Sequence, residues 1–426
     1  MLIYHALWTL LVVALTPILP LRKSARLRSR IAPRLGLRPP RPGCVWVHAL
    51  SVGEVLSAVP LVHELVSRFP QRDVVVTVTT AQGMDVARKE IGPVVHSLLP
   101  MPLDFWGAYR RLCRFLNPGI FVLVETDLWP GLMQHLRCRG IPTVVVNGRV
   151  SPRTHRGYRR MGPLARFVLK EPVLWLMQSE HDRKRLIDAG VDGNRIRVTG
   201  NIKFDRERRP MESRERRTVA SALGISASDG PVWVAGSTHP GEEDVLLEVF
   251  ARLRRRFSSL RLVLAPRRVE RAHEVQGKAE ELHLSVALRS GPDAEKTRSS
   301  VVVLDTLGEL ERVYGLAFVS FVGGSLVSIG GHNLLEPAGF GRPVLFGPHM
   351  HNFQELSERL LEAGGGVCVR DGQELERVVI QLLGNPEEAD RMGERARAFV
   401  ESNRGAVERV WTQLNRVVPL GPPEAL

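Results

Sequence analysis

The sequence predicts an α/β protein with two doubly wound, Rossmann-like domains that face each other across a cleft. Short, continuous apolar runs alternate with amphipathic segments, and such runs are typical of parallel strands buried on both faces. The length of 426 residues suits two domains. A polar stretch at residues 206–230 separates the two alternating regions. Functional residues are expected where the strands end, because doubly wound sheets bind ligands at their carboxyl edge.

The apolar runs give the expected positions of the strands. In the first region they lie at 45–50, 74–80, 96–99, 120–125, 143–147, 174–178 and 196–199. In the second region they lie at 231–235, 260–265, 301–304, 317–322, 343–346 and 366–369. We therefore place the first domain at residues 22–205 and the second domain at residues 206–426.

The N-terminus predicts attachment to a membrane. Residues 1–21 are almost entirely apolar, and a run of arginines follows directly. About 20 apolar residues can span a bilayer, and basic residues stay on the cytoplasmic side. Pro17 and Pro20 shorten the helical run, so an interfacial helix that does not cross the membrane is the alternative. A cleaved signal peptide is disfavoured, because its positive charges would precede the apolar core.

The distribution of charge argues against a nucleic-acid-binding protein, and the cysteine content argues against a disulfide-rich or zinc-binding one. The chain carries 59 Lys and Arg against 45 Asp and Glu, a formal net charge of +14. Such a balance is compatible with nucleic-acid binding, but the arginines are spread along predicted helices without interleaved aromatic residues. A membrane surface or an acidic substrate fits better. The four cysteines form no C-x-x-C pair, which argues against a disulfide framework or a zinc site.

Residues 321–338 form the most informative motif. A predicted strand runs into glycine pairs at 323–324 and 330–331, and Asn333 and Glu336 then open a helix. Glycine lets a backbone approach a ligand closely, and a helix N-terminus presents N–H groups to an anion. No Gly-Lys-Ser/Thr follows, so the motif is not a P-loop. A nucleotide-phosphate site in the second of two α/β domains points to a nucleotide-sugar glycosyltransferase.

Glu54 follows the first predicted strand, in the stretch that contains Ser51 and Gly53. The spacing Ser51-x-x-Glu54 favours a capping box, in which Glu54 only bonds the backbone at the helix start. The alternative is a general base that takes a proton from an acceptor hydroxyl. The spacing alone leaves both interpretations open.

Three other polar residues end strands or turns of the first domain. Glu125 closes the fourth predicted strand and is as compatible with a site as with a structural role. Arg149 follows the fifth strand and could bind an anionic acceptor, although a polar turn is the simpler interpretation. Lys203 closes the domain and could neutralise a carboxylate or phosphate, although a single Lys is usually solvated.

The second domain offers further contacts to a nucleotide sugar. A Gly-Ser-Thr turn could hold phosphate or a sugar carboxylate, and Arg267 could pair with phosphate as a bidentate donor. Glu336 could accept both ribose hydroxyls. No cluster has metal-ligand spacing. The candidate residues beyond Arg267 and Glu336 are Ser237, Thr238, His239, Pro266, Leu307, Gly308, Glu309, Gly324, Ser325, Gly331, His332 and Asn333.

Taken together, these motifs closely resemble the 3-deoxy-D-manno-octulosonic acid (Kdo) transferases of Gram-negative bacteria. The matching segments run in order over nearly the whole chain, and the apolar N-terminus matches too. The matching segments are residues 48–54, 79–84, 125–130, 147–149, 200–205, 235–243, 264–268, 305–310, 321–338 and 346–353.

The resemblance implies the B-type glycosyltransferase fold and transfer of Kdo from CMP-Kdo to a lipid A precursor (lipid IVA), with inversion. It implies that Glu54 is the general base, and that Glu125 and Lys203 support the transition state. It implies an acceptor-binding first domain and a second domain that holds CMP. The implied CMP contacts are Pro266, Arg267, Leu307, Gly308, Glu309, Asn333, Leu334, Leu335 and Glu336.

The resemblance also implies a setting for the reaction. The pathway is lipopolysaccharide inner-core synthesis, and the location is the cytoplasmic side of the bacterial inner membrane. The resemblance implies no metal and no cofactor, since CMP-Kdo is a substrate. One alternative is another B-type glycosyltransferase that uses a UDP-sugar. The other is a non-catalytic nucleotide-sugar-binding subunit, against which the intact Glu54, Lys203 and Glu336 argue.

Overall fold

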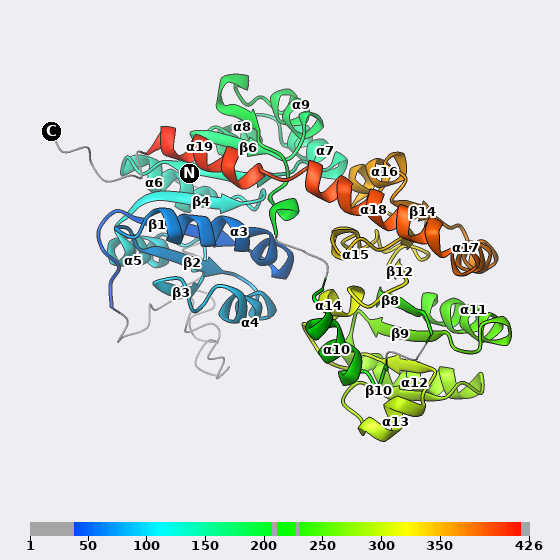
Figure 1. The fold of residues 1–426 in the computed structure, drawn as a ribbon. Helices are drawn as coiled ribbons and strands as arrows, with labels where there is room; N and C mark the ends of the chain where they lie inside the picture. Colours follow the sequence, from blue (N-terminus) through cyan, green and yellow to red (C-terminus); the bar gives the residue numbers. More distant parts are fainter. Residues whose placement is uncertain (1–37, 207–210, 227–229, 419–426) are drawn as a thin grey trace, which may run out of the picture. The chain divides into compact units, whose positions relative to one another are not determined.

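The computed structural model describes residues 38–206, 211–226 and 230–418 (Figure 1). The chain divides into two compact units, Met1–Arg206 with Asn403–Leu426, and Glu207–Ser402. The predicted membrane segment at residues 1–21 lies outside the described residues. Within the described ranges, no helix is both long and apolar enough to cross a bilayer.

The first unit is built on a seven-stranded parallel sheet with the order β3-β2-β1-β4-β5-β6-β7. The order reverses between β1 and β4, which makes their carboxyl ends the switch point where ligands of such sheets bind. The strands are β1 (Cys44–Ala49), β2 (Val74–Val78), β3 (Ser97–Pro100), β4 (Pro118–Val124), β5 (Thr143–Gly148), β6 (Leu174–Met177) and β7 (Ile196–Val198).

Helices cover both faces of this sheet. Val45 and Val47 of β1 pack in one core with α3 (Val52–Arg68), α4 (Ala81–Glu90) and α19 (Ala406–Val417), whereas Trp46 points into the opposite core. The alternation follows from the two-residue period of a strand. The helices on the Trp46 side are α5 (Trp106–Leu116), α6 (Pro130–Cys138), α8 (Pro163–Leu169) and α9 (Glu180–Asp188).

The second unit repeats the architecture with the parallel order β10-β11-β9-β8-β12-β13-β14. Its switch point lies between β8 and β12. The strands are β8 (Val232–Thr238), β9 (Arg261–Pro266), β10 (Val286–Leu288), β11 (Val301–Val303), β12 (Val319–Val322), β13 (Val344–Phe346) and β14 (Gly366–Cys368).

Nine helices accompany this sheet within the described part of the second unit. They are α10 (Ser213–Ala222), α11 (Glu242–Arg256), α12 (Ala272–Glu281), α13 (Asp293–Arg298), α14 (Leu310–Tyr314), α15 (Leu335–Gly339), α16 (Gln354–Glu362), α17 (Gly372–Gly384) and α18 (Pro386–Ser402). Helices α11, α12 and α17 share one hydrophobic core with the sheet.

The structure contains every predicted strand and one that the sequence did not predict. The additional strand, β10, is three residues long and pairs with β11. A run this short does not stand out from its polar flanks.

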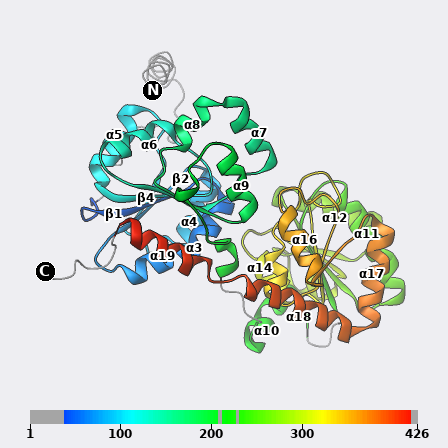
Figure 2. The same cartoon turned by 90° about the horizontal axis from the view of Figure 1, so that it is seen from above.

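The last helix departs from the predicted division, in which residues 206–426 belong to the second domain. Helix α19 joins the first unit, where Ala406, Val410 and Leu414 are buried beside α3 (Figure 2). The rings of Trp411 and Phe69 lie 4.3 Å apart. Burial of this apolar face determines where the helix packs, so the segment returns to the domain in which the chain began.

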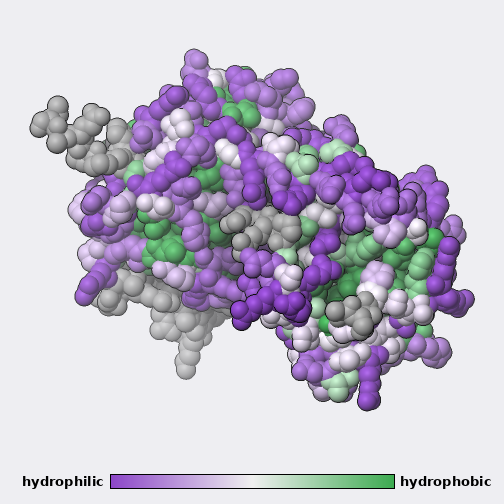
Figure 3. All heavy atoms as spheres, in the orientation of Figure 1, coloured by the Kyte–Doolittle hydropathy of each residue, from purple (hydrophilic) through white to green (hydrophobic). Residues whose placement is uncertain are grey.

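The face of the molecule in Figure 3 is largely hydrophilic. The basic run on helix α7 (Pro152–Met161) belongs to the exposed surface, and no residue of that helix is buried. Its four arginines, Arg153, Arg156, Arg159 and Arg160, are all exposed. Leu164, just beyond the helix, is an apolar side chain that remains 62% exposed.

Candidate active site

Glu54 lies at the switch point of the first sheet, in the first turn of α3. The predicted capping box is not formed, because the Ser51 side chain accepts no hydrogen bond from the helix. The Glu54 carboxylate instead bends back toward β1, where Oε2 accepts a 2.5 Å hydrogen bond from the Leu50 N–H. Its Oε1 has no hydrogen bond within the described residues, so one oxygen is available to a substrate. Gly53, beside it, is exposed.

The surroundings of Glu54 make its carboxyl group unusually basic. Burial, and then the negative charges of Glu125 and Asp127, raise its pKa to about 8, while the Leu50 N–H and Lys203 act in the opposite direction. A general base is most effective when its pKa lies near the working pH. Glu54 therefore has the environment of a proton acceptor, in addition to its contact with the backbone.

Glu125 and Lys203 form an ion pair beside Glu54. Lys203 Nζ lies 2.9 Å from Glu125 Oε1, and both side chains are about three-quarters buried, with 26% and 23% exposed. Glu125 follows β4 directly, with a φ of 62° in the left-handed region. A non-glycine residue in that region is strained, and such strain often marks a functional site. The structure thus brings together all three predicted catalytic residues.

Asn147, at the end of β5, places Lys203. Its Oδ1 accepts a 3.1 Å hydrogen bond from the N–H of Ile202, which begins the short 3₁₀ turn Ile202–Asp205. Asn147 is fully buried and has a φ of 59°. Asn adopts left-handed backbone more readily than most residues, which is the one sequence signal for this role.

Asp104 supports the segment that follows Glu125. Its two carboxylate oxygens accept hydrogen bonds of 2.8 Å from the N–H groups of Gly131 and Leu132, at the start of α6. The residue in the N-cap position, Trp129, makes no side-chain cap. Capping motifs are recognised in residues adjacent to the helix start, so a cap from a residue this far away cannot be predicted from the sequence pattern.

Arg149 follows β5 and is half-buried. Its carbonyl accepts a 2.8 Å hydrogen bond from the hydroxyl of Thr126, which lies between Glu125 and Asp127 in the loop after β4. Within the described part of the chain, the guanidinium group has no hydrogen bond or ion pair. It is therefore available to an anionic group.

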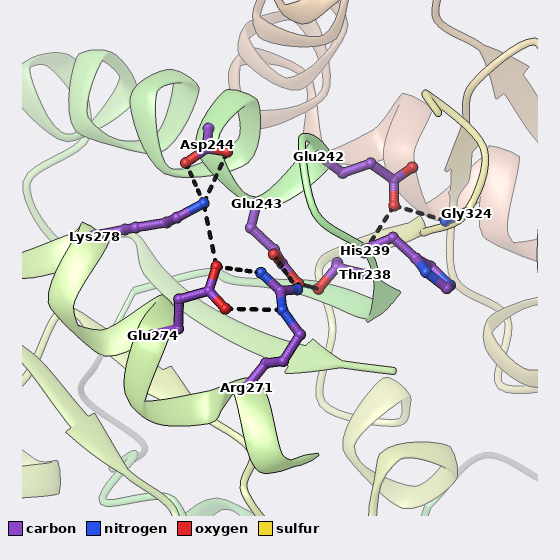
Figure 4. Close-up of polar contacts among 9 residues, drawn as sticks. All are labelled: Thr238, His239, Glu242, Glu243, Asp244, Arg271, Glu274, Lys278 and Gly324. Carbon is purple, nitrogen blue, oxygen red and sulfur yellow. Dashed lines mark hydrogen bonds and ion pairs between the residues drawn. The ribbon is translucent and has the colours of Figure 1, made fainter. Parts of the chain in front are cut away.

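The glycine loop after β12 does not present its N–H groups as expected. That of Gly324 donates to the buried carboxylate of Glu242 over 2.7 Å (Figure 4). That of Ser325 donates to the same carboxylate over 2.8 Å. Those of Gly330 and Gly331 donate to the Gly324 carbonyl. These four N–H groups therefore already have acceptors within the protein, and contacts from this loop to the donor remain a prediction.

The helix after the loop begins without a conventional cap. Helix α15 is five residues long, and Asn333 Oδ1 accepts a 3.2 Å hydrogen bond from the Leu335 N–H. Asn333 Nδ2 donates to Glu336 Oε1 over 3.2 Å, and Leu334 is buried. Asn333 and Glu336 thus form a polar pair at the carboxyl edge of the sheet.

His239 and His332 meet across the switch point of the second sheet. Their Nε2 atoms are 2.8 Å apart and their rings are stacked, with an interplanar angle of 6°. One ring nitrogen must donate and the other accept, so the pair shares a single proton. Burial, followed by the charge of Arg267, lowers the pKa of His332 to about 4, and burial also lowers the pKa of His239. Both rings are therefore neutral near pH 7.

The other predicted donor residues lie at neighbouring strand ends. Ser237, with a φ of 57°, and the buried Thr238 end β8. The buried Pro266 ends β9, and the exposed Arg267 follows it, with an N–H that donates to the Thr238 carbonyl over 2.9 Å. The Arg267 guanidinium has no hydrogen bond or ion pair among the described residues, which suits a phosphate ligand.

The turn from Leu307 to Glu309 follows β11. Leu307 is 77% exposed, and Gly308 has a φ of 83° that favours glycine. Glu309 accepts hydrogen bonds from Thr306 Oγ1 and Arg289 Nη2, so its orientation is fixed. An exposed apolar side chain at the carboxyl edge could cover a flat base.

Two doubly wound parallel domains, each with polar residues at its switch point, define the B-type glycosyltransferase architecture. Among solved structures, UDP-GlcNAc 2-epimerase from Neisseria meningitidis, bound to UDP-GlcNAc, matches with a TM-score of 0.62. The match covers 87% of this chain and 99% of that chain, at 14% sequence identity. It supports the fold alone.

Sequence comparison identifies the family. A family model described as 3-deoxy-D-manno-octulosonic-acid transferase (kdotransferase) matches residues 26–206. The transferase of that name from Haemophilus influenzae is 34% identical over 394 residues, 91% of each chain. That from Chlamydophila psittaci is 32% identical over 391 residues, 91% of this chain and 89% of the relative. The chain belongs to the Kdo transferase family, as its motifs predicted, and is a glycosyltransferase.

Proposed function

We propose that this enzyme transfers Kdo from CMP-Kdo to a lipid A precursor in lipopolysaccharide biosynthesis. The observation that carries the proposal is the group formed by Glu54, Glu125 and Lys203 at the switch point of the first sheet. The group combines a basic carboxyl at the head of α3 with a fixed cation 2.9 Å from the neighbouring carboxylate. Membership of the Kdo transferase family supports the choice of sugar.

Glu54 takes the proton from the acceptor hydroxyl, and the resulting oxygen attacks the anomeric carbon of Kdo. The bond between that carbon and the phosphate oxygen breaks, and CMP leaves with the electron pair. Attack opposite the leaving group inverts the anomeric centre. Lys203 opposes the rise in the pKa of Glu54 and so favours the ionised, reactive form of the base.

The second domain holds the nucleotide in this proposal. The Arg267 guanidinium, which has no partner among the described residues, binds the single phosphate, and Glu336 accepts hydrogen bonds from the ribose hydroxyls. The turn from Leu307 to Glu309 contacts the base.

Positive charge aimed at the leaving phosphate is the main source of rate enhancement, so we propose a reaction without metal. Transfer that persists in excess EDTA is the expected result, and its loss with recovery on adding a divalent cation would contradict that point.

We further propose that the protein works at the cytoplasmic face of the bacterial inner membrane. The lipid acceptor resides there, and the exposed arginines of α7 suit anionic head groups. Flotation with vesicles that contain anionic lipid tests this placement. A full-length chain that stays entirely unbound at low salt would contradict it.

The test of function is Kdo transfer from CMP-Kdo to a tetra-acylated lipid A precursor. Glu54→Gln keeps the size of the side chain and removes the base, so we expect turnover to fall about a hundredfold or more with unchanged CMP affinity. Glu64→Gln, on the same helix, is the matched control and should behave as the wild type. A wild type that binds UDP rather than CMP would instead indicate a UDP-sugar transferase.

A further inference from the structure

Glu242 is an unusual residue at the start of α11. It is fully buried, and its carboxylate accepts four backbone hydrogen bonds. Oε2 accepts from His239 and Gly324, over 3.1 and 2.7 Å, and Oε1 accepts from Ser325 and Leu326, both over 2.8 Å. A carboxylate has about four acceptor positions, so all of them are used.

These bonds join two loops that flank the switch point of the second sheet. One is the turn between β8 and α11, which carries His239, and the other is the glycine loop after β12. Converging backbone N–H groups form a concavity that binds anions. Here the anion is the Glu242 carboxylate of the same chain, so these N–H groups are not available to an external anion.

The position of the glycine loop determines the position of the two imidazoles. A Cβ atom added at Gly324 would lie 3.0 Å from His332 Cδ2 and 3.5 Å from His239 Cδ2. The loop backbone therefore packs directly against both rings. Because Glu242 holds Gly324 on one side and the His239 N–H on the other, it sets the contact between His239 and His332.

The adjacent carboxylate shows a different arrangement (Figure 4). Glu243, also fully buried, is paired with Arg271 over 2.6 Å, and Arg271 in turn binds Glu274. Glu242 has no such cation among the described residues and is held by N–H groups alone. A buried charge without a paired cation is costly. This cost is understandable if the residue orders a binding site rather than merely stabilising the domain.

We infer that Glu242 is the positioning residue of the donor site. Its carboxylate locks the glycine loop against the β8 turn, and so presents the histidine pair and the neighbouring Arg267 to the negatively charged part of the donor. The inference rests on the proposed function, which places CMP-Kdo at this edge of the sheet. It assigns donor binding to side chains and not to the N–H groups of the glycine loop.

The test compares Glu242→Gln with wild type in donor KM, kcat and CMP affinity. The amide keeps the size of the side chain, but its NH₂ group faces N–H donors and releases two of the four bonds. We expect the donor KM and the Kd for CMP to rise about tenfold or more, with kcat at saturating donor within about threefold. The acceptor KM should not change.

Arg261→Gln is the control for a loss of stability alone. Arg261 is buried at the opposite end of β9 from the donor site, where its Nη2 bonds the Lys296 carbonyl over 2.8 Å. Its loss should destabilise the second domain in urea and leave the donor KM unchanged. If Arg261→Gln raised the donor KM as much as Glu242→Gln, the role of Glu242 would be structural and the inference would be overturned.

Gly324→Ala provides a second route if Glu242→Gln does not fold. The added methyl group presses on His332, so the donor KM should rise in this variant as well, and an unchanged KM overturns the inference.

A wild type that binds CMP, with a Glu242→Gln variant that binds it equally well, overturns the inference alone. A wild type that binds neither CMP nor CMP-Kdo overturns the proposed function and the inference with it.

Discussion

Lys203 Nζ and Glu125 Oε1 lie 2.9 Å apart, although 78 residues separate them in the sequence. The pair lies next to the carboxyl group of Glu54, whose pKa Glu125 raises and Lys203 lowers. The three side chains therefore form one electrostatic unit. A change in any of them alters the proton affinity of the proposed base.

The first prediction concerns the pH dependence of transfer. Only the ionised form of Glu54 can accept a proton, and its pKa is about 8. We expect kcat/KM to rise about tenfold per pH unit below that value and to level off above it. Initial rates between pH 6 and pH 9 measure this. A profile that is flat from pH 6 upward would show that the active base has an ordinary carboxyl pKa.

The second prediction concerns stability. Folding raises the pKa of Glu54 from 4.5 to about 8, so the folded protein binds an extra proton between these values. The associated stability is fully present below pH 4.5 and is lost as the pH rises to 8. Glu54→Gln has no such loss and should be more stable than wild type at pH 8, by up to about 4 kcal/mol. Urea unfolding should give nearly equal stabilities at pH 4.5, and a difference independent of pH would contradict the assignment.

The third prediction follows from the charge of Lys203. Lys203→Met removes the cation that lowers the pKa of Glu54, so the rising limb of the pH–rate profile should move to higher pH. Activity at pH 7 should fall about tenfold or more. The control is Lys89→Met, an exposed position on α4 of the same domain. A loss of activity in Lys203→Met without a shift in the profile would exclude the coupling.

The fourth prediction separates two properties of Asn147. Asn147→Ala loses the bond to the Ile202 N–H and strains the left-handed backbone, whereas Asn147→Gly loses only the bond. Both variants should lower kcat, because the turn that carries Lys203 is released. Asn147→Gly should be more stable than Asn147→Ala by about 1 kcal/mol in urea unfolding. Wild-type kcat in both variants would remove Asn147 from the site.

The fifth prediction tests the remote cap of α6. Asp104→Ala leaves the N–H groups of Gly131 and Leu132 without their acceptor, and should cost about 2 kcal/mol in unfolding free energy. Asp104→Asn retains one oxygen acceptor and should lose less. Urea denaturation of both variants measures the difference. Equal losses would indicate that one hydrogen bond, and not the paired contact, provides the cap.

Much of the fold could be predicted because parallel strands buried on both faces produce continuous apolar runs. The run Val74–Val78 is a clear example, and it forms β2 as expected. Strand β10 was missed because three residues between polar neighbours carry too little pattern. Helix α19 was assigned to the wrong domain because an amphipathic pattern shows that a helix is buried on one face but not against which core.

The predicted site residues lie at strand ends because those positions follow from the fold itself. Their partners could not be predicted in the same way. The residues Ser51-x-x-Glu54 match a capping box, yet the Glu54 carboxylate bonds the Leu50 N–H instead. The glycine loop matches an anion site, yet Glu242 occupies it. In both cases the local pattern is compatible with several hydrogen-bond partners, and the backbone path selects one.

The sequence by itself determined the two-domain α/β class, nearly all of the strands, the Kdo transferase family and the identity of the candidate catalytic residues. These properties depend on burial patterns and on motifs that are continuous along the chain. Only the tertiary structure decided that Lys203 pairs with Glu125, that α19 packs on the first domain and that Glu242 fills the glycine loop. Each of these contacts joins distant segments, and their distances depend on how the chain is folded between them.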